Sequence, residues 1–166
     1  MNNFQLLTEQ IMNIISKLLV YILLSMIVLV ILTIFLRYFF SIGSISIQEL
    51  IMYFHASIFM LGISYTYKEN SHVKIDIFYN KLSEKNKTIL SLIGVILLII
   101  PFAIFIIFIS FDMVSSSWSI FEGSSEAGGL DLVFILKSLI PLSGFLILLQ
   151  ALSELFKNLQ ILKNEY

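Results

Sequence analysis

Four long apolar runs, separated by short polar connections, make up most of this chain of 166 residues. Three of the runs carry no charged residue and the fourth carries one; the runs are Leu18–Leu36, Leu50–Tyr67, Thr88–Phe111 and Leu132–Leu152. An α-helix rises about 1.5 Å per residue, so each run can cross the roughly 30 Å of hydrocarbon in a bilayer. The pattern predicts an all-α integral membrane protein with four transmembrane helices in one compact bundle. We place the spans at about residues 18–37, 47–67, 88–111 and 132–152 of a single domain covering residues 1–166.

The N-terminal segment Met1–Ser16 admits two structures. Leu7, Ile11 and Ile14 recur at helical spacing, which is typical of a short amphipathic helix lying on the membrane surface. The segment can equally continue the first transmembrane helix. It is not expected to be a cleavable signal peptide, because the segment before the first apolar run has no lysine or arginine until Lys17.

The distribution of charge predicts how the chain is oriented in the membrane. Four spans place both termini and the connection Lys68–Lys87 on one side, and these segments hold eight of the ten basic residues. The other side holds Arg37 and the segment Asp112–Asp131, which is acidic and has no basic residue. Because basic residues favour the cytoplasmic side of a membrane, we expect both termini to be cytoplasmic.

The basic connection Lys68–Lys87 mixes apolar and charged residues. Ile75, Phe78 and Leu82 would share one face of a short helix, whereas the alternation from Val73 to Tyr79 also fits an extended strand. We favour a short amphipathic helix on the cytoplasmic surface, with the strand as the alternative.

Composition narrows the function further. The chain is 58% hydrophobic and 13% charged, its net charge is −1, and it has no cysteine. These values exclude a basic nucleic-acid interface, disulfides, thiolate metal sites and cysteine nucleophiles. The sequence has no HExxH, GxSxG or Walker motif, so we expect neither an enzyme nor a bound cofactor.

Few ionisable residues accompany the spans, and each has a structural interpretation. Arg37 can extend to the outer headgroups, or it can form an ion pair with Glu49 across the turn between the first two spans. Lys137 can extend toward the outer headgroups, or it can meet Glu49 or an acidic residue of the loop before it; we favour an ion pair at the outer rim. Trp118 follows the outer end of the third span, where tryptophan often anchors a helix at the interface.

His55 lies near the middle of the second span, on the helical stripe Gln48, Met52, His55, Phe59 and Gly62. We favour a neutral histidine that is hydrogen-bonded at a helix–helix contact. A haem ligand or a proton relay is the alternative. A haem held by two histidines would need a second one in the membrane, and His72 lies in the cytoplasmic connection.

Several blocks of the sequence, taken in order, carry a family resemblance. They are Leu36–Phe39 (LRYF), Ile47–Leu50 (IQEL), Leu61–Thr66 (LGISYT), His72–Ile77 (HVKIDI), Trp118–Leu130 (WSIFEGSSEAGGL) and Lys137–Leu142 (KSLIPL). The chain resembles the small membrane subunit of tripartite ATP-independent periplasmic (TRAP) transporters over about Leu18–Leu155. The last two blocks resemble the mannitol/chloroaromatic subtype. Ile47 departs from the family, whose members often have tryptophan at this position.

The resemblance implies a small accessory subunit in a bacterial inner membrane. Such a subunit stiffens a large membrane subunit, which carries the substrate and sodium sites and takes up an organic acid delivered by a periplasmic binding protein. In that setting Arg37, Glu49, His55 and Lys137 are candidates for structural or partner contacts. The loop Asp112–Asp131, with Trp118, Glu122 and Glu126, is expected to belong to the outer surface that faces the binding protein.

Two other functions remain open from the sequence. A membrane anchor for a redox enzyme would hold haem or quinone. The small number of histidines argues against this function. A small self-assembling channel would need a polar stripe along its spans, and the spans are almost wholly apolar.

Overall fold

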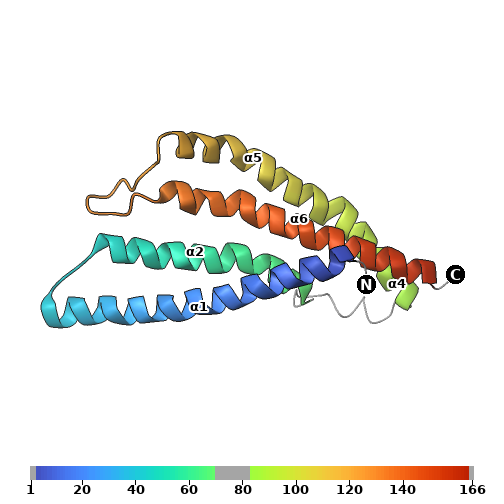
Figure 1. Ribbon diagram of the computed structural model, residues 1–166, viewed down its shortest axis with the longest axis horizontal. Coiled ribbons are helices and arrows are strands. Elements are labelled where there is room, and N and C mark those ends of the chain that lie inside the picture. Colours follow the sequence, from blue (N-terminus) through green and yellow to red (C-terminus); the bar gives the residue numbers. More distant parts are fainter. Residues whose placement is uncertain (1–2, 70–82, 165–166) are drawn as a thin grey trace.

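The computed structural model describes residues 3–69 and 83–164, and these residues form long helices. The helices are α1 (Asn3–Phe40), α2 (Ile45–Lys68), α4 (Glu84–Gly94), the π-helix η1 (Val95–Ile99), α5 (Ile100–Ser119) and α6 (Val133–Asn164) (Figure 1). Because α4, η1 and α5 follow one another without a break, there are four helical rods, each long and apolar enough to cross a membrane. The prediction of an all-α protein with four such helices is confirmed. The predicted amphipathic connection falls largely on residues 70–82, outside the described residues.

The four rods lie in a row rather than in the compact bundle expected from the sequence. α2 packs between α1 and α6, and α5 packs on the far side of α6 (Figure 1). The start of α1 and the end of α6 lie at the same end of the rods, which we call the terminal end. The α1–α2 and α5–α6 connections lie at the opposite end of the rods, which we call the loop end (Figure 1). α2 and α6 therefore have neighbours on two sides, whereas α1 and α5 each have one main neighbour and leave broad faces uncovered.

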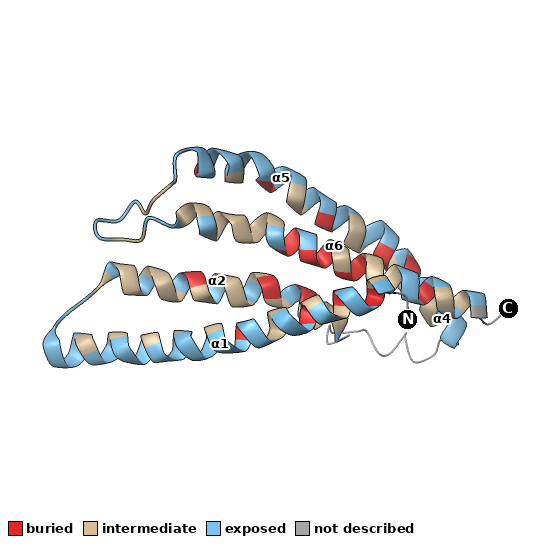
Figure 2. Cartoon of the chain, viewed as in Figure 1, coloured by how far each residue is buried: buried red, intermediate tan, exposed pale blue. Residues whose placement is uncertain are grey.

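The best-buried residues lie toward the terminal end, where the rods converge (Figure 2). Met12 and Leu19 of α1 pack there with Leu61 of α2 and Leu146 of α6. Segment 3–16 is part of the single helix α1, so of the two structures open for the N-terminus the continuation of the first span is the one observed. Met12 lies in this segment and has no exposed area. A helix on the membrane surface would leave Met12 outside the core, so the burial of this segment explains the result.

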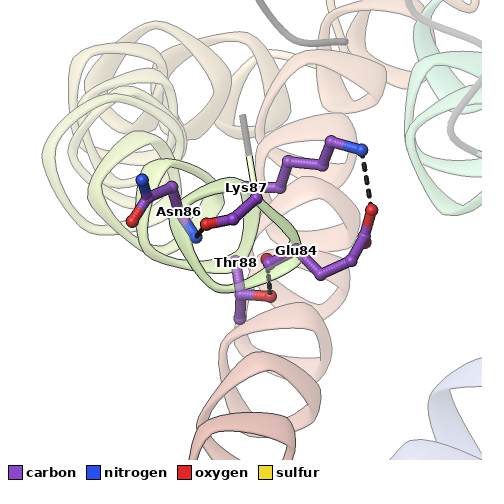
Figure 3. Close-up of polar contacts among 5 residues, drawn as sticks. Glu84, Asn86, Lys87 and Thr88 are labelled. Carbon is purple, nitrogen blue, oxygen red and sulfur yellow. Dashed lines mark hydrogen bonds and ion pairs between the residues drawn. The ribbon is translucent and has the colours of Figure 1, made fainter. Parts of the chain in front are cut away.

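A polar helix start marks the boundary between the second connection and the third rod. The hydroxyl of Ser83 accepts a hydrogen bond from the backbone N–H of Asn86 at 3.4 Å and so caps α4. Figure 3 shows the next contacts of this turn: Lys87 forms an ion pair with Glu84 at 2.7 Å, and Thr88 donates to the Glu84 carbonyl. The apolar part of the rod begins directly after this turn.

The π-helix η1 accommodates Pro101 without breaking the third rod. Proline has no backbone N–H, and in an α-helix its ring clashes with the carbonyl four residues earlier, here that of Leu97. In the segment before it the backbone N–H of Ile100 reaches the carbonyl of Val95, a spacing of five residues. This wider turn makes room for the ring, so the rod stays continuous through the proline.

Small residues allow α5 to approach α6 closely. Ala103, Ser110 and Ser117 recur every seven residues along α5 and are buried. Opposite them lies Gly144 of α6, where an added Cβ would lie 3.0 Å from Ile107 Cγ1 and 3.2 Å from the Ala103 carbonyl oxygen. The seam between these two helices thus depends on the absence of a side chain at residue 144.

Replacing Gly144 by valine should therefore separate α5 from α6. Overpacking of this kind lowers the free energy of unfolding by about 1–3 kcal/mol. Thermal unfolding in detergent measures the loss, and Trp118, the single tryptophan of the chain, provides a fluorescence signal at the end of α5. Gly94→Ala is the matched control, since a Cβ there meets nothing within 4 Å. Equal unfolding temperatures for Gly144→Val and the unmodified protein would contradict the close seam.

Candidate functional site

The α5–α6 connection at the loop end, residues 120–132, is an ordered turn that the sequence alone presents only as a glycine- and serine-rich loop. Its two limbs are joined by a hydrogen bond from the backbone N–H of Ser124 to the carbonyl of Leu130 at 3.0 Å. A second bond, from the N–H of Gly129 to the carbonyl of Glu126, closes the tip. Gly128 lies between them with φ of 81°, a conformation that glycine adopts without strain.

The carboxylate of Glu49 joins this loop to α2. Its Oε2 accepts the backbone N–H of Leu130 at 2.6 Å, and its Oε1 accepts the hydroxyl of Ser124. One turn earlier on α2, the hydroxyl of Ser46 donates to the carbonyl of Gly128. We call these three bonds the Glu49 clasp. Hydrogen bonds to an ionised group are the stronger ones in proteins, so the clasp holds two segments that are about eighty residues apart in the sequence.

Gly129 is required by the clasp rather than by its own backbone angles. A Cβ at this position would lie 2.8 Å from Glu49 Oε1 and closer still to the side chain of Ser124. The loop backbone therefore approaches the carboxylate at a distance that leaves no room for a side chain.

The first limb of the loop, which follows α5, is also joined to α6. Lys137 forms an ion pair and hydrogen bond with Glu122, and both side chains are only partly exposed. The ammonium group of Lys137 holds the pKa of the Glu122 carboxyl below its ordinary value. The outer-rim ion pair favoured for Lys137 is thus made with an acidic residue of the loop and not with Glu49.

Trp118 adds an aromatic contact to the same limb. Its indole N–H donates to the hydroxyl of Ser138 at 2.7 Å, and its ring packs edge-on against Phe134, with the ring centroids 4.8 Å apart. Phe121 packs on the same ring of Phe134 at 5.6 Å. The end of α5 and the start of α6 are therefore held together by polar and aromatic contacts in addition to the ion pair.

The alternative ion pair between Arg37 and Glu49 is wrong. Arg37 is exposed in the last turns of α1, and in the described residues it has no acidic partner. The physical reason is that both carboxylate oxygens of Glu49 already accept hydrogen bonds from the loop. The contact of Arg37 with lipid headgroups stays a prediction.

The remaining candidates face outward. His55 is exposed on α2, so the expected helix–helix contact is not formed among residues 3–69 and 83–164. Glu126 is exposed at the loop tip, where its backbone rather than its carboxylate takes part in the turn. Three members of the clasp, Ser46, Ser124 and Gly129, are not predicted from the sequence. Only the dipeptides Ser124-Ser125 and Gly128-Gly129 signalled a turn there, and neither signal indicates a bond to α2.

The arrangement is suited to holding the loop end rigid rather than to a reaction. Glu49, Glu122 and Lys137 are engaged with one another or with the loop, and the tip residues Ser125–Gly128, including the carboxylate of Glu126, are exposed beyond them. A family model described as "Tripartite ATP-independent periplasmic transporters, DctQ component" matches residues 26–161, well over half of the chain. No curated protein matches the chain significantly.

Removing the carboxylate of Glu49 should free the loop from α2. Glu49→Ala abolishes two of the three clasp bonds, and bonds to an ionised acceptor are the stronger hydrogen bonds in proteins. Hydrogen exchange measured by mass spectrometry should therefore show faster exchange of the Leu130 amide, by about tenfold or more. Glu126→Ala removes a carboxylate from the same loop without touching the clasp. Unchanged exchange in Glu49→Ala, or an equal rise in Glu126→Ala, would contradict the clasp.

The Lys137–Glu122 pair should make stability depend on pH. Because the pKa of Glu122 is lowered in the folded protein, its contribution is fully present above the pKa of an unpaired glutamate, about 4.3. The contribution is lost as the pH falls through the lowered pKa. The unfolding temperature in detergent should thus fall less between pH 7 and pH 3 in Glu122→Gln than in the unmodified protein. Glu126→Gln is the control and should keep the full fall; the reverse ranking would exclude the pair as a source of pH dependence.

Proposed function

The chain belongs to the family of DctQ components of tripartite ATP-independent periplasmic transporters, and we propose that it is the accessory subunit that scaffolds the large membrane subunit of such a transporter. Membership makes it a small membrane component of a transport system and not an enzyme. The proposal extends this to sodium-driven uptake of an organic acid that a periplasmic binding protein delivers. It places the chain in a bacterial inner membrane with both termini in the cytoplasm.

The open row of helices is the observation that supports a scaffold. A transporter that carries its own substrate path needs polar groups that converge inside the membrane. In the described residues the ionisable side chains near the membrane are engaged at the rim, as Glu49 and Lys137 are, or face outward, as His55 does. Broad apolar faces on α1 and α5 are left for lipid or for another membrane protein. The chain is therefore suited to supporting a subunit that has the substrate site.

The clasped loop supports a role at the outer surface. Restraint by Glu49 and Lys137 keeps residues 120–132 in one conformation, which lowers the entropy lost when a second protein binds. Glu126 at the exposed tip would meet the binding protein first. The blocks Trp118–Leu130 and Lys137–Leu142, on which the resemblance to the mannitol/chloroaromatic subtype rests, cover this same region. For that subtype we propose 2-oxo or hydroxy acids as substrates.

A pull-down of the tagged protein from its native membrane in mild detergent tests the assignment. We expect a large multi-span membrane protein to co-purify in stoichiometric amount, as mass spectrometry would identify. Recovery of a flavin or iron–sulfur enzyme would favour a redox anchor instead. Recovery of the chain only as a homo-oligomer would favour a channel, and either result would overturn the proposal.

A further inference from the structure

One face of α2 is uncovered along the whole helix. Its exposed residues follow one another at spacings of three or four, and they are Gln48, Met52, His55, Phe59 and Ile63. The remaining positions from Ile47 to Lys68 are buried or half-buried, because α1 and α6 flank the helix on its other sides. We call these five residues the α2 stripe. Gly62, placed on the stripe from sequence, is instead near Leu19 of α1, and Ile63 takes its position.

The α2 stripe differs in chemistry from the other uncovered faces. The exposed middle of α1 is mainly apolar, as at Val28 and Ile31, with the hydroxyls of Tyr21 and Ser25 as its polar groups, and that of α5 presents Phe105 and Phe108. Such faces are suited to lipid. The α2 stripe, in contrast, carries the imidazole of His55 in the middle of the helix and the amide of Gln48 at its outer end.

Two hydroxyls of α2 that lie off the stripe are satisfied within the helix, whereas those of Tyr53 and Ser64 are buried without a hydrogen-bond partner among the described residues. The hydroxyl of Ser57 donates to the carbonyl of Tyr53 at 2.8 Å, and that of Thr66 donates to the carbonyl of Gly62 at 2.9 Å. Neither the His55 ring nor the Gln48 amide has a hydrogen-bond partner among residues 3–69 and 83–164. Lipid tails provide no donor or acceptor, so both groups would be costly if this face met hydrocarbon.

We propose that the α2 stripe is the surface on which a membrane-spanning helix of the large subunit packs, with a hydrogen-bonding group placed at the depth of His55. The inference rests on the proposed function, because the partner it names is the large subunit of the same transporter. The position of the α2 stripe supports the large subunit as the partner. Gln48 is adjacent to Glu49, so the stripe runs directly into the clasped loop at the outer surface. A partner on the stripe would thus also lie beside that loop.

Site-specific photocrosslinking in native membranes tests the surface. Benzoylphenylalanine replaces Phe59 on the stripe or Phe108 on α5, two phenylalanines that are 68% and 76% exposed. We expect irradiation to join position 59, and not position 108, to the large multi-span protein that the pull-down recovers. A lipid adduct alone at position 59, an adduct between two copies of this chain, or an equal yield from position 108 would overturn the inference while leaving the proposed function intact. A pull-down without any large subunit would overturn both.

Substitution of His55 tests the hydrogen bond itself. His55→Leu keeps an apolar side chain on the stripe but removes donor and acceptor, whereas His55→Gln retains both. Hydrogen bonds between membrane helices are worth enough to change association about threefold to tenfold. Retention of the large subunit in the pull-down should therefore fall by that factor in His55→Leu and stay near the unmodified level in His55→Gln. Equal retention by both variants would contradict a hydrogen bond at this position.

Discussion

A polar group in hydrocarbon needs a partner, and the structure of this chain follows from that constraint. Within each span the helical backbone pairs its own N–H and C=O groups, which is one of the two arrangements that can cross a bilayer. Side chains follow the same rule wherever the chain can satisfy it: Ser57, Thr66 and Ser110 donate to carbonyls of their own helices. Most of the charged and polar groups that are not satisfied in this way lie at the loop end or face outward, whereas the hydroxyls of Tyr53 and Ser64 are buried without a partner among the described residues.

At the loop end the constraint creates tertiary structure. Glu49 and Lys137 are charged residues near the ends of apolar helices, and each is paired with the connection between α5 and α6. These contacts link α2 to a loop formed by the other half of the chain, where the rods themselves are less closely packed (Figure 2). A charge that would be costly in lipid thus becomes the point at which the loop is attached to the helices.

A row of helices leaves much more surface uncovered than a closed bundle, which is consistent with a subunit that is completed by another protein. Faces of α1 and α5 have the apolar character of a lipid contact, while α2 has a stripe with two polar side chains. The residues of all three faces are exposed. The α2 stripe differs from the faces of α1 and α5 in the hydrogen-bonding capacity of its exposed residues.

The sequence by itself determined the number of spans, the all-helical fold and the family, because apolar length and ordered motifs are local properties of the chain. It also favoured an ion pair for Lys137 but left Glu49 and the acidic residues of the loop open as partners, and the structure pairs it with Glu122. It could not assign Glu49 to Ser124 and Leu130, exclude its pairing with Arg37, or place His55 on an uncovered face. Those outcomes depend on which helices become neighbours and on how closely Gly129 and Gly144 allow segments to approach. Only the tertiary structure decided them, since pairing across about eighty residues has no local signature in the sequence.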